Sequence, residues 1–315
     1  MIAVNVFSVA APARAPVTNR LAIALTLVAA VATAHVTHAQ SPASATSAEH
    51  LPHPLAQRLG HGDALYLGEG GTQFFAIATD SETATAQGGV ILIPDASTHP
   101  NWPRVIRPLR TGLPAHGWTT LAIEMPPLTG LNDLQPLQPE IDARMNAAIA
   151  HLHSSGINNI ALVGHGIGAS AALSYLLRAP RERNAQALVA IGIRLTETHP
   201  EHPYTIDLLE GMTVPILDIY GSRDMDAVLQ TTAARRLAAK TAATTAERER
   251  SVEFFKQATI AQTPYAKRQG NIIYRQQRVE GADHDFSGMS DVLVKRVAGW
   301  LARHATGVTL IPAAK

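Results

Sequence analysis

Residues 162–170 read LVGHGIGAS and carry glycine at every second position, at Gly164, Gly166 and Gly168. When such a run joins a strand to a helix, it forms the sharp turn on which hydrolytic enzymes present a nucleophile at the central position. The flanking glycines are needed because strand and helix approach closely at this turn. Here the central residue is Gly166, which has no side chain. The turn is therefore predicted to keep its shape while lacking the atom that would attack a substrate.

Two further residues follow in the order that a nucleophile, acid and histidine take along the chain in such enzymes. Asp224 comes after the apolar run ILDIYG, and His284 lies in the sequence VEGADHDF, ahead of the last predicted helix. The histidine would act as a general base, and the carboxylate would fix its tautomer and orientation. The sequence therefore predicts Asp224 as the acid and His284 as the base beside the vacant nucleophile position of Gly166.

Alternating strand-like and helix-like segments are expected to position these residues. Short β-branched runs predict strands at 64–67, 74–79, 88–94, 119–126, 159–164, 187–193, 215–221 and 271–281. Apolar residues at helical spacing predict helices at 138–153, 167–178, 227–240 and 291–303. The first two strands flank GEGG and are typical of an antiparallel hairpin, whereas most of the others lack the polar alternation of half-exposed strands.

These elements predict one α/β domain with a doubly wound, mostly parallel sheet and an N-terminal antiparallel hairpin. Only about twenty residues separate Ile193 from Pro215, which leaves no room for a large lid. With 46% hydrophobic and 16% charged residues, the 315-residue chain has the balance of a globular protein. Lys and Arg number 26 against 25 for Asp and Glu, so nucleic acid is not predicted as a partner. The sequence contains no cysteine, which excludes thiol nucleophiles and cysteine-ligated zinc.

The N-terminal region is predicted to be a secretory signal peptide. Arg14 and Arg20 precede the apolar run at 21–34, and small residues follow, so cleavage is expected after Ala34 or Ala39. The run is shorter than the ~20 residues that a membrane-spanning helix needs, although an uncleaved anchor is the alternative. We therefore expect a periplasmic or secreted protein with no transmembrane span after signal cleavage. The predicted organisation is a signal peptide at 1–39, a linker at 40–49, the folded domain at 50–305 and a C-terminal tail at 306–315.

With these motifs the chain resembles the α/β-hydrolase superfamily over essentially its whole mature length. The stretch HPNWPRVIRPLRTGLPAHGWTTLAIEMP at 99–126, together with GHGIGAS and the HDF loop, is most similar to an uncharacterised family of exported α/β-hydrolase-like proteins of Gram-negative bacteria. In that family glycine is common at the turn. The resemblance implies the α/β-hydrolase fold, with Gly166 at the nucleophile position, Asp224 as the acid and His284 as the base.

A second departure from active members of the superfamily concerns the loop after the strand at 88–94. That loop usually carries a His-Gly pair and supplies one N–H of the oxyanion hole. Here the sequence LIPDAS puts Pro94 and Asp95 in its place. Proline has no N–H, and a carboxylate would repel a developing oxyanion, so the hole is expected to be impaired. Asp95, His165 and Ile167 are the residues expected to line the remaining binding site.

Three other interpretations of these residues are less favoured. A dinucleotide-binding turn needs its third glycine one position later and lies near the first strand, so no nucleotide cofactor is predicted. His165, Asp224 and His284 could converge on a metal, but no H-x-x-x-H spacing supports this, and no metal is predicted. Three serines are not expected to replace the nucleophile. Ser170 lies about one turn inside the helix that follows the glycine run and is expected to point away from the cleft. Ser222 and Ser287 lack the strained turn that presents a nucleophile and are expected to be loop hydroxyls that bond local backbone.

The leading hypothesis is a non-catalytic or weakly catalytic α/β-hydrolase-like protein whose cleft is kept for binding or scaffolding. Its partner would be a small molecule or a periplasmic protein of unknown identity. The alternative is an active ester or amide hydrolase that uses water, or an unrecognised nucleophile, activated by the pair of His284 and Asp224. A third possibility is a secreted partner-binding domain with no ligand in the cleft.

Overall fold

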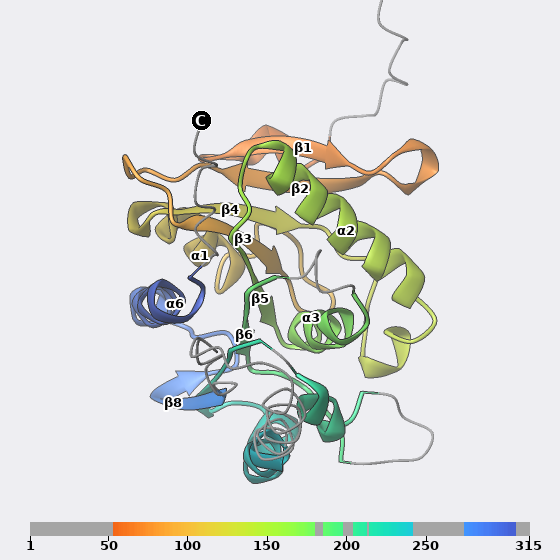
Figure 1. Cartoon of the computed structure of the whole chain (residues 1–315), viewed down its shortest axis with the longest axis vertical. Helices are drawn as coiled ribbons and strands as arrows, with labels where there is room; N and C mark the ends of the chain where they lie inside the picture. Colours follow the sequence, from red (N-terminus) through yellow and green to blue (C-terminus); the bar gives the residue numbers. More distant parts are fainter. Residues whose placement is uncertain (1–52, 180–184, 198–203, 213, 242–273, 307–315) are drawn as a thin grey trace, which may run out of the picture. The chain divides into compact units, whose positions relative to one another are not determined.

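The computed structural model of the chain describes residues 53–179, 185–197, 204–212, 214–241 and 274–306 (Figure 1). The predicted signal peptide and linker, and the tail from residue 307 on, lie outside the described residues. The described part belongs to one compact unit that begins at Leu51. No helix within it is both long and apolar enough to cross a bilayer.

Eight strands in the described residues form one sheet, in the order β1-β2-β4-β3-β5-β6-β7-β8. The strands are β1 (Asp63–Leu67), β2 (Phe74–Thr79), β3 (Gly88–Ile93), β4 (Trp118–Ile123), β5 (Ile160–His165), β6 (Ala187–Ile191), β7 (Ile216–Arg223) and β8 (Tyr274–Asp283). β2 pairs antiparallel with both β1 and β4, and every other neighbouring pair is parallel. The predicted hairpin and the mostly parallel, doubly wound sheet are therefore both confirmed.

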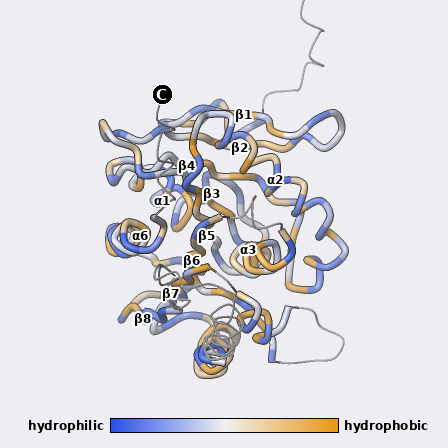
Figure 2. Tube along the Cα trace, viewed as in Figure 1, coloured by the Kyte–Doolittle hydropathy of each residue, from blue (hydrophilic) through white to orange (hydrophobic). Residues whose placement is uncertain are grey.

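Helices cover both faces of this sheet, α2 and α3 on one and α1 and α6 on the other (Figure 1). Their bounds are α1 (Ile106–Gly112), α2 (Gln138–Ser154), α3 (Ile167–Arg178), α4 (Asp226–Leu229) and α6 (Ser290–His304). Strand β3 contributes to the hydrophobic core on both faces of the sheet, because its side chains alternate between them. Ile91 and Ile93 belong to the core beneath α2 and α3, while Val90 and Leu92 belong to the core beneath α1 and α6. The central strands are correspondingly apolar along their length (Figure 2), as expected for strands buried on both faces.

The predicted elements differ from the observed ones mainly at their ends. The strand expected at 119–126 stops at Ile123, and the strand expected at 271–281 continues to Asp283. The helix expected at 227–240 is interrupted: α4 ends at Leu229, and the chain is helical again from residue 232. Near this break the hydroxyl of Thr232 donates to the carbonyl of Leu229 at 2.8 Å, a local bond that competes with regular helix. The described part of the β6–β7 connection holds only a short 3-10 helix, η6 (Ile206–Gly211), and no large lid.

The sheet topology also determines where polar loops meet. Because β3, β5, β6, β7 and β8 run parallel, their carboxyl ends lie at one edge of the sheet, where ligand sites of open α/β sheets form. The residues that follow these strands at this edge are Asp95, Gly166, Arg194, Asp224 and His284.

Candidate active site

The turn after β5 has the geometry that the glycine pattern predicts. Gly166 stands at the N-terminus of α3 with φ 53° and ψ −118°, a backbone conformation that residues with a side chain adopt only at a cost. A Cβ on Gly164 would lie 2.5 Å from the Cα of Ala169, and one on Gly168 would lie 2.3 Å from the carbonyl oxygen of Pro94. Strand, helix and the β3 loop therefore approach closely here, as the sequence indicated.

The space beside Gly166 is filled by the side chain of Asp95. A Cβ built on Gly166 would lie 2.2 Å from both Cγ and Oδ1 of Asp95, and 2.4 Å from Oδ2. Such distances are far shorter than any van der Waals contact, so a side chain at position 166 and the present position of Asp95 exclude each other. The vacant nucleophile position is thus occupied by a carboxylate from the β3 loop.

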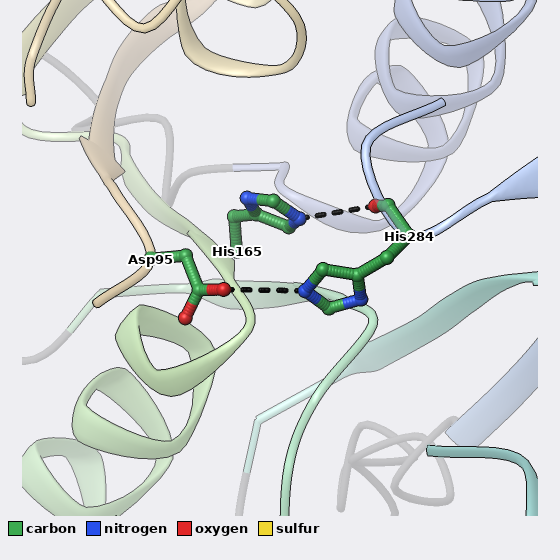
Figure 3. A group of neighbouring side chains, drawn as sticks. All are labelled: Asp95, His165 and His284. Carbon is green, nitrogen blue, oxygen red and sulfur yellow. Dashed lines mark hydrogen bonds and ion pairs between the residues drawn. The ribbon is translucent and has the colours of Figure 1, made fainter. Parts of the chain in front are cut away.

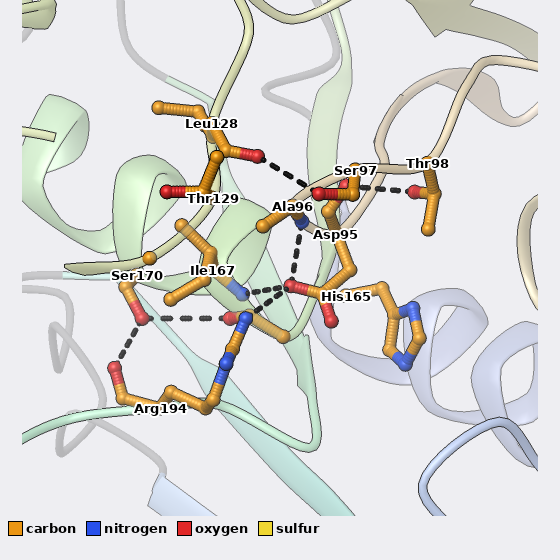
Figure 4. A network of polar contacts seen from close by, with 12 residues as sticks. Asp95, Ala96, Ser97, Thr98, Leu128, Thr129, His165, Ile167, Ser170 and Arg194 are labelled. Carbon is orange, nitrogen blue, oxygen red and sulfur yellow. Dashed lines mark hydrogen bonds and ion pairs between the residues drawn. The ribbon is translucent and has the colours of Figure 1, made fainter. Parts of the chain in front are cut away.

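Three donors hold one oxygen of this carboxylate (Figure 4). Oδ1 of Asp95 accepts hydrogen bonds from the backbone N–H of Ile167 at 2.6 Å, the backbone N–H of Ala96 at 2.7 Å and Nη2 of Arg194 at 3.0 Å. The residue after the nucleophile and a residue of the β3 loop are the two that supply an oxyanion hole in hydrolases with this turn. Asp95 therefore places a negative oxygen where such a hole would bind one.

Pro94 supplies no N–H at this edge, as its residue type requires, but another donor of the same loop lies close by. Although Pro94 lacks an N–H, the next turn of the loop brings the N–H of Ala96 to the same oxygen as that of Ile167. The expected repulsion is also replaced by attraction, because Asp95 itself is the anion that these groups bind. The two donors are present, and an internal carboxylate occupies them.

The predicted acid and base meet beside this carboxylate. Nδ1 of His284 lies 2.6 Å from Oδ1 of Asp224. Nε2 of His284 lies 3.2 Å from Oδ2 of Asp95, the contact drawn in Figure 3. Asp224 is buried and also accepts the backbone N–H groups of Gly221 at 3.1 Å and Met225 at 2.8 Å. The structure therefore brings Gly166, Asp224 and His284 together as predicted, with Asp95 inserted between the turn and the histidine.

Electrostatics make His284 a cation in this arrangement. Burial alone would lower its pKa, but the hydrogen bonds and charges of Asp224 and Asp95 outweigh burial and raise the pKa of His284 to about 9. Burial likewise works to raise the pKa of each carboxyl, yet the bonds from His284 hold the pKa of both Asp95 and Asp224 below the usual range. At neutral pH the imidazolium already carries the proton that a general base would have to accept.

His165 lies behind this group and is fully buried. Its Nε2 donates to the backbone carbonyl of His284 at 3.1 Å, and the centroids of the two rings are 4.6 Å apart. Burial, followed by the charge of His284, lowers the pKa of His165, so its ring is neutral. His165 therefore supports the loop that carries His284, and its role as a binding residue stays a prediction.

The residues that could share a metal differ from those considered in the sequence. Ligand atoms of Asp95, His165 and His284 lie within 4.8 Å of one another, whereas Asp224 is not part of this group. Two imidazoles and a carboxylate suit zinc or iron. However, Nε2 of His165 faces a carbonyl, and Arg194 already supplies a positive charge 3.0 Å from Asp95. These contacts favour an ion-pair network over a bound cation.

The role of Arg194 was not predicted from the sequence. It follows β6 in the run IGIR, and the only signal for it is its place at the carboxyl end of a parallel strand. Its backbone carbonyl accepts the buried hydroxyl of Ser170, which links the Arg194 loop to α3. Ser170 therefore has a structural partner, consistent with its expected exclusion as a nucleophile.

The other two serines also have partners. The hydroxyl of Ser222 accepts the backbone N–H of Gly281 at 2.8 Å, but Ser222 lies in β7 and its partner in β8, so neither the expected loop position nor the expected local partner is found. The hydroxyl of Ser287 instead accepts the side chain of Arg104 at 2.7 Å, so its expected bond to local backbone is not the contact formed by its oxygen. Arg104 also lies 3.7 Å from Asp285, and together these contacts tie the β3–α1 connection to the loop of His284.

Two cavities lined by described residues lie away from this centre. One, of about 410 Å³, is bordered by Glu197, Ile206, Asp207, Glu210, Ala234, Leu237, Ala238 and Thr241. The other, of about 390 Å³, lies between α1 and α6 and is bordered by Pro108, Thr111, Gly112, His116, Asp291, Val294 and Lys295. Neither includes a residue of the carboxylate–histidine group.

Comparison with known proteins adds a family and a fold. The family model DUF3530, described as a protein of unknown function, matches residues 17–139 and 132–249, so His284 lies beyond the matched part. No curated protein matches the chain significantly.

Among solved structures, dienelactone hydrolase from Anabaena variabilis has a TM-score of 0.50 at 19% identity, over 78% of this chain and 98% of that one. The esterase domain of a Rhodothermus marinus protein has a TM-score of 0.50 at 13% identity, over 77% and 98% of the two chains. The predicted CIB-like hydrolase of Thermoplasma acidophilum has a TM-score of 0.51 at 11% identity, over 76% and 97%. At such identities these similarities show the α/β-hydrolase fold alone.

Proposed function

The chain belongs to the DUF3530 family and has the α/β-hydrolase fold, and from this premise we propose that it is an exported protein that has lost serine-dependent ester and amide hydrolysis. One observation carries the proposal. The carboxylate of Asp95 fills the space of a side chain at Gly166 and also binds the N–H groups of Ala96 and Ile167. As a serine hydrolase the protein is a pseudoenzyme.

Acyl transfer needs a nucleophile, a free oxyanion hole and an unprotonated base, and each is compromised here. Loss of a serine nucleophile costs about a million-fold in rate in a well-studied protease. Loss of a single oxyanion-hole donor costs about 100- to 1,000-fold, and here both N–H groups are bound to Asp95. With the pKa of His284 raised to about 9, its neutral form is a minor one at pH 7.

The alternative, in which His284 activates a water molecule against an ester, meets the same obstacle. Oδ2 of Asp95 lies 3.2 Å from Nε2 of His284, in the position that an activated water would need. We therefore favour a binding or scaffolding role, in which the charged network holds the loops after β3, β6, β7 and β8 in one arrangement. The partner would be a small molecule or a periplasmic protein that docks at this edge of the sheet.

The test is to rebuild the missing nucleophile with and without the blocking carboxylate. Wild type, G166S and D95G/G166S are assayed with p-nitrophenyl acetate and with a fluorophosphonate probe that labels activated serines. The double variant D95G/G166A has the same strained turn without a hydroxyl and is the matched control. We expect labelling and ester hydrolysis only in D95G/G166S, because a serine beside Asp95 would clash with its carboxylate. Ester hydrolysis by wild type that H284Q abolishes would contradict the proposal.

Export is inferred from the predicted signal peptide at 1–39, and we infer that DUF3530 proteins of this type form an exported α/β-hydrolase-like family of Gram-negative bacteria with glycine at the turn. Protein recovered from a periplasmic extract of a Gram-negative host should begin at His35 or Gln40, as N-terminal sequencing would reveal. An intact N-terminus in a membrane fraction would instead support an uncleaved anchor.

A further inference from the structure

The outer surface of α6 carries several cations on one stripe of the helix. One side of α6 packs into the core beneath the sheet, through Leu293, Val294, Val297, Ala298, Trp300 and Leu301. The exposed residues Val292, Lys295, Arg296 and Arg303 are spaced so that they share the opposite side of the helix. Because the packed side is held in the core, this stripe faces solvent.

A fourth cation extends the stripe onto β8, the edge strand of the described sheet. Burial, followed by the charges of Arg303 and Arg275, lowers the pKa of His304, so both guanidinium groups act on its ring. Nη1 of Arg296 donates to Oε1 of Gln277 in β8 at 3.4 Å. α6 and β8 therefore present one basic surface, which we call the α6 face and which consists of Arg275, Lys295, Arg296 and Arg303.

The cations of the α6 face differ from most other arginines in their partners. Six arginines elsewhere lie 3.7 Å or less from a carboxylate; they are Arg104, Arg144, Arg178, Arg194, Arg235 and Arg278. Within the described residues, the α6 face forms no such pair. Asp291 is the one acidic residue of α6, so the face and this residue carry four positive charges and one negative charge, although the whole chain has a net charge of +1. Positive charge is therefore concentrated on this face.

We propose that the α6 face docks the protein on the surface of a bilayer that contains anionic phospholipids. The inference goes beyond the proposed function, which concerns the strand ends. Guanidinium groups bind phosphate oxygens well, because their planar N–H groups can donate two hydrogen bonds to one phosphate. Each Lys or Arg close to an anionic bilayer strengthens binding by about fivefold, and clusters of about four or more are typical of surfaces that bind such lipids.

The length of the α6 face favours an array of headgroups over a single small anion. Arg296 and Arg303 are seven positions apart, which corresponds to about 10 Å along a helix. One phosphate group cannot contact both side chains at their helix positions, whereas neighbouring lipids in a bilayer can. The charge complementarity therefore extends over a surface, as a membrane provides.

The packing of α6 limits how deeply the protein can enter the bilayer. Helices that lie within a membrane interface bury an apolar side among the acyl chains. The apolar side of α6 is already buried in the protein core, and Leu293 and Trp300 are fully buried there. Val292, which is 40% exposed, is the large apolar side chain on the exposed stripe. Docking is therefore expected at the level of the headgroups, and salt should weaken it.

The first experiment measures binding to vesicles. Protein recovered from a periplasmic extract is mixed with vesicles of phosphatidylcholine, or of phosphatidylcholine and phosphatidylglycerol in equal amounts, and bound protein is sedimented. We expect binding only to the anionic vesicles. Raising the salt from about 0.1 M to about 1 M, which shortens the Debye length from about 10 Å to about 3 Å, should release the protein. The variant K295Q/R296Q/R303Q should bind about 100-fold more weakly than wild type.

A matched control separates the α6 face from the net charge of the chain. R178Q/R236Q/K240Q also removes three exposed cations, but from the opposite side of the sheet. Arg178 lies in α3, and the other two lie in the helical segment from residue 232, whose Ala238 belongs to the core beneath α2 and α3. This variant should bind anionic vesicles as wild type does. Circular dichroism confirms that each variant is folded.

A second experiment identifies the side of the protein that meets the vesicle. The chain has no cysteine, so V292C and L237C each provide one site for an environment-sensitive dye. Val292 lies on the exposed stripe of α6, and Leu237, which is 67% exposed, lies in the helical segment on the opposite side of the sheet. Anionic vesicles should shift the emission of the dye at position 292 to the blue and leave the dye at position 237 unchanged.

The absence of binding to anionic vesicles, or equal binding to neutral and anionic ones, would overturn the inference. So would equal loss of binding in the two triple variants, or a dye that responds at position 237 and not at position 292. Binding to inorganic polyphosphate without binding to anionic vesicles would assign the α6 face to a soluble polyanion and would also overturn it. None of these outcomes bears on the loss of ester hydrolysis, which is tested separately.

Discussion

Two charged networks on this sheet differ in how far solvent reaches them. Arg235 and Asp218 form an ion pair at 2.8 Å with 0% and 1% of their side chains exposed. Asp95 and His284 form one at 3.2 Å with 11% and 15% exposed. The first network lies within the sheet and its covering helix, and the second lies where the strands end.

The two networks also differ in whether a partner of the carboxylate titrates in the ordinary pH range. Asp218 accepts Nε of Arg235 at 2.8 Å, the hydroxyl of Tyr274 at 2.5 Å and Nε2 of Gln276 at 3.0 Å. Burial and the charge of Asp218 raise the pKa of Tyr274, so this hydroxyl stays a donor at every ordinary pH. The network around Asp218 has one arrangement and serves structure.

Each carboxylate has three donors on one oxygen, but the second oxygens differ. That of Asp218 accepts Nη2 of Arg235 at 3.3 Å, whereas that of Asp95 faces the imidazolium of His284, whose pKa is raised to about 9. The comparison shows that charge beneath or beside a sheet does not by itself indicate a functional site. Partial exposure and a titratable neighbour distinguish the centre around Asp95 from the network around Asp218.

The largest expected effect comes from breaking the buried network. R235M leaves Asp218 buried without its cation, and we expect a loss of about 3–5 kcal/mol in the free energy of unfolding. R278M removes the exposed partner of Glu280 and should cost less than about 0.5 kcal/mol. Urea unfolding of both variants measures the difference. Equal losses would show that burial does not separate the two kinds of ion pair.

The next largest effect should be the dependence of the free energy of unfolding on pH, which we attribute to the network around His284. The pKa of His284 is about 9 in the folded protein, against 6.5 in the unfolded chain, so folding binds its proton more tightly. The resulting stabilisation is fully present below pH 6.5 and is lost as pH rises through 9. It amounts to at most about 3 kcal/mol. Urea unfolding at pH 6, 7.5 and 9.5 should show this decline in wild type and a flatter profile in H284Q. A flat wild-type profile would contradict the assigned ion pair.

Removing the inserted carboxylate should have a smaller, local effect. In D95N, His284 keeps only Asp224 as an acidic partner, so its pKa should fall by about one unit or more. NMR titration of the imidazole measures this directly, and E280Q provides a control that should leave the His284 pKa unchanged. An unaltered pKa in D95N would mean that Asp95 is not the second partner of His284.

The smallest expected effect concerns the link between the turn and Arg194. S170A removes the hydroxyl that donates to the carbonyl of Arg194 and should cost about 1 kcal/mol. Thermal and urea unfolding measure this loss. Ser170 has a structural partner, so S170A and wild type should react equally with a fluorophosphonate probe. If the probe labelled wild type but not S170A, Ser170 would be identified as a reactive serine.

Much of the fold was predictable because its signals are local. Runs such as VILI and IALV lack polar alternation, and the strands at 88–93 and 160–165 appear where those runs lie. Strand and helix ends were less predictable: β4 stops at Ile123 and β8 continues to Asp283. The lengths depend on pairing with neighbouring strands, which hydrophobic periodicity does not specify.

The candidate site was predictable in outline but not in detail. Gly166, Asp224 and His284 gather because the carboxyl ends of parallel strands share one edge, and the sequence places each of them after such a strand. Asp95 was expected to weaken an oxyanion hole, and Arg194 was not expected in the site at all. Which way a loop carboxylate turns depends on donors that are not its neighbours in sequence.

The sequence by itself determined the sheet, the glycine turn without a nucleophile and the order of the acid and the histidine, since each depends on residues adjacent or regularly spaced along the chain. Only the tertiary structure decided that Asp95 fills the place of the missing side chain. Its donors Ile167 and Arg194 lie 72 and 99 positions away and reach it only once β3, β5 and β6 lie side by side. A carboxylate that loses most of its hydration settles where N–H groups and a cation compensate for that loss, and folding creates that place.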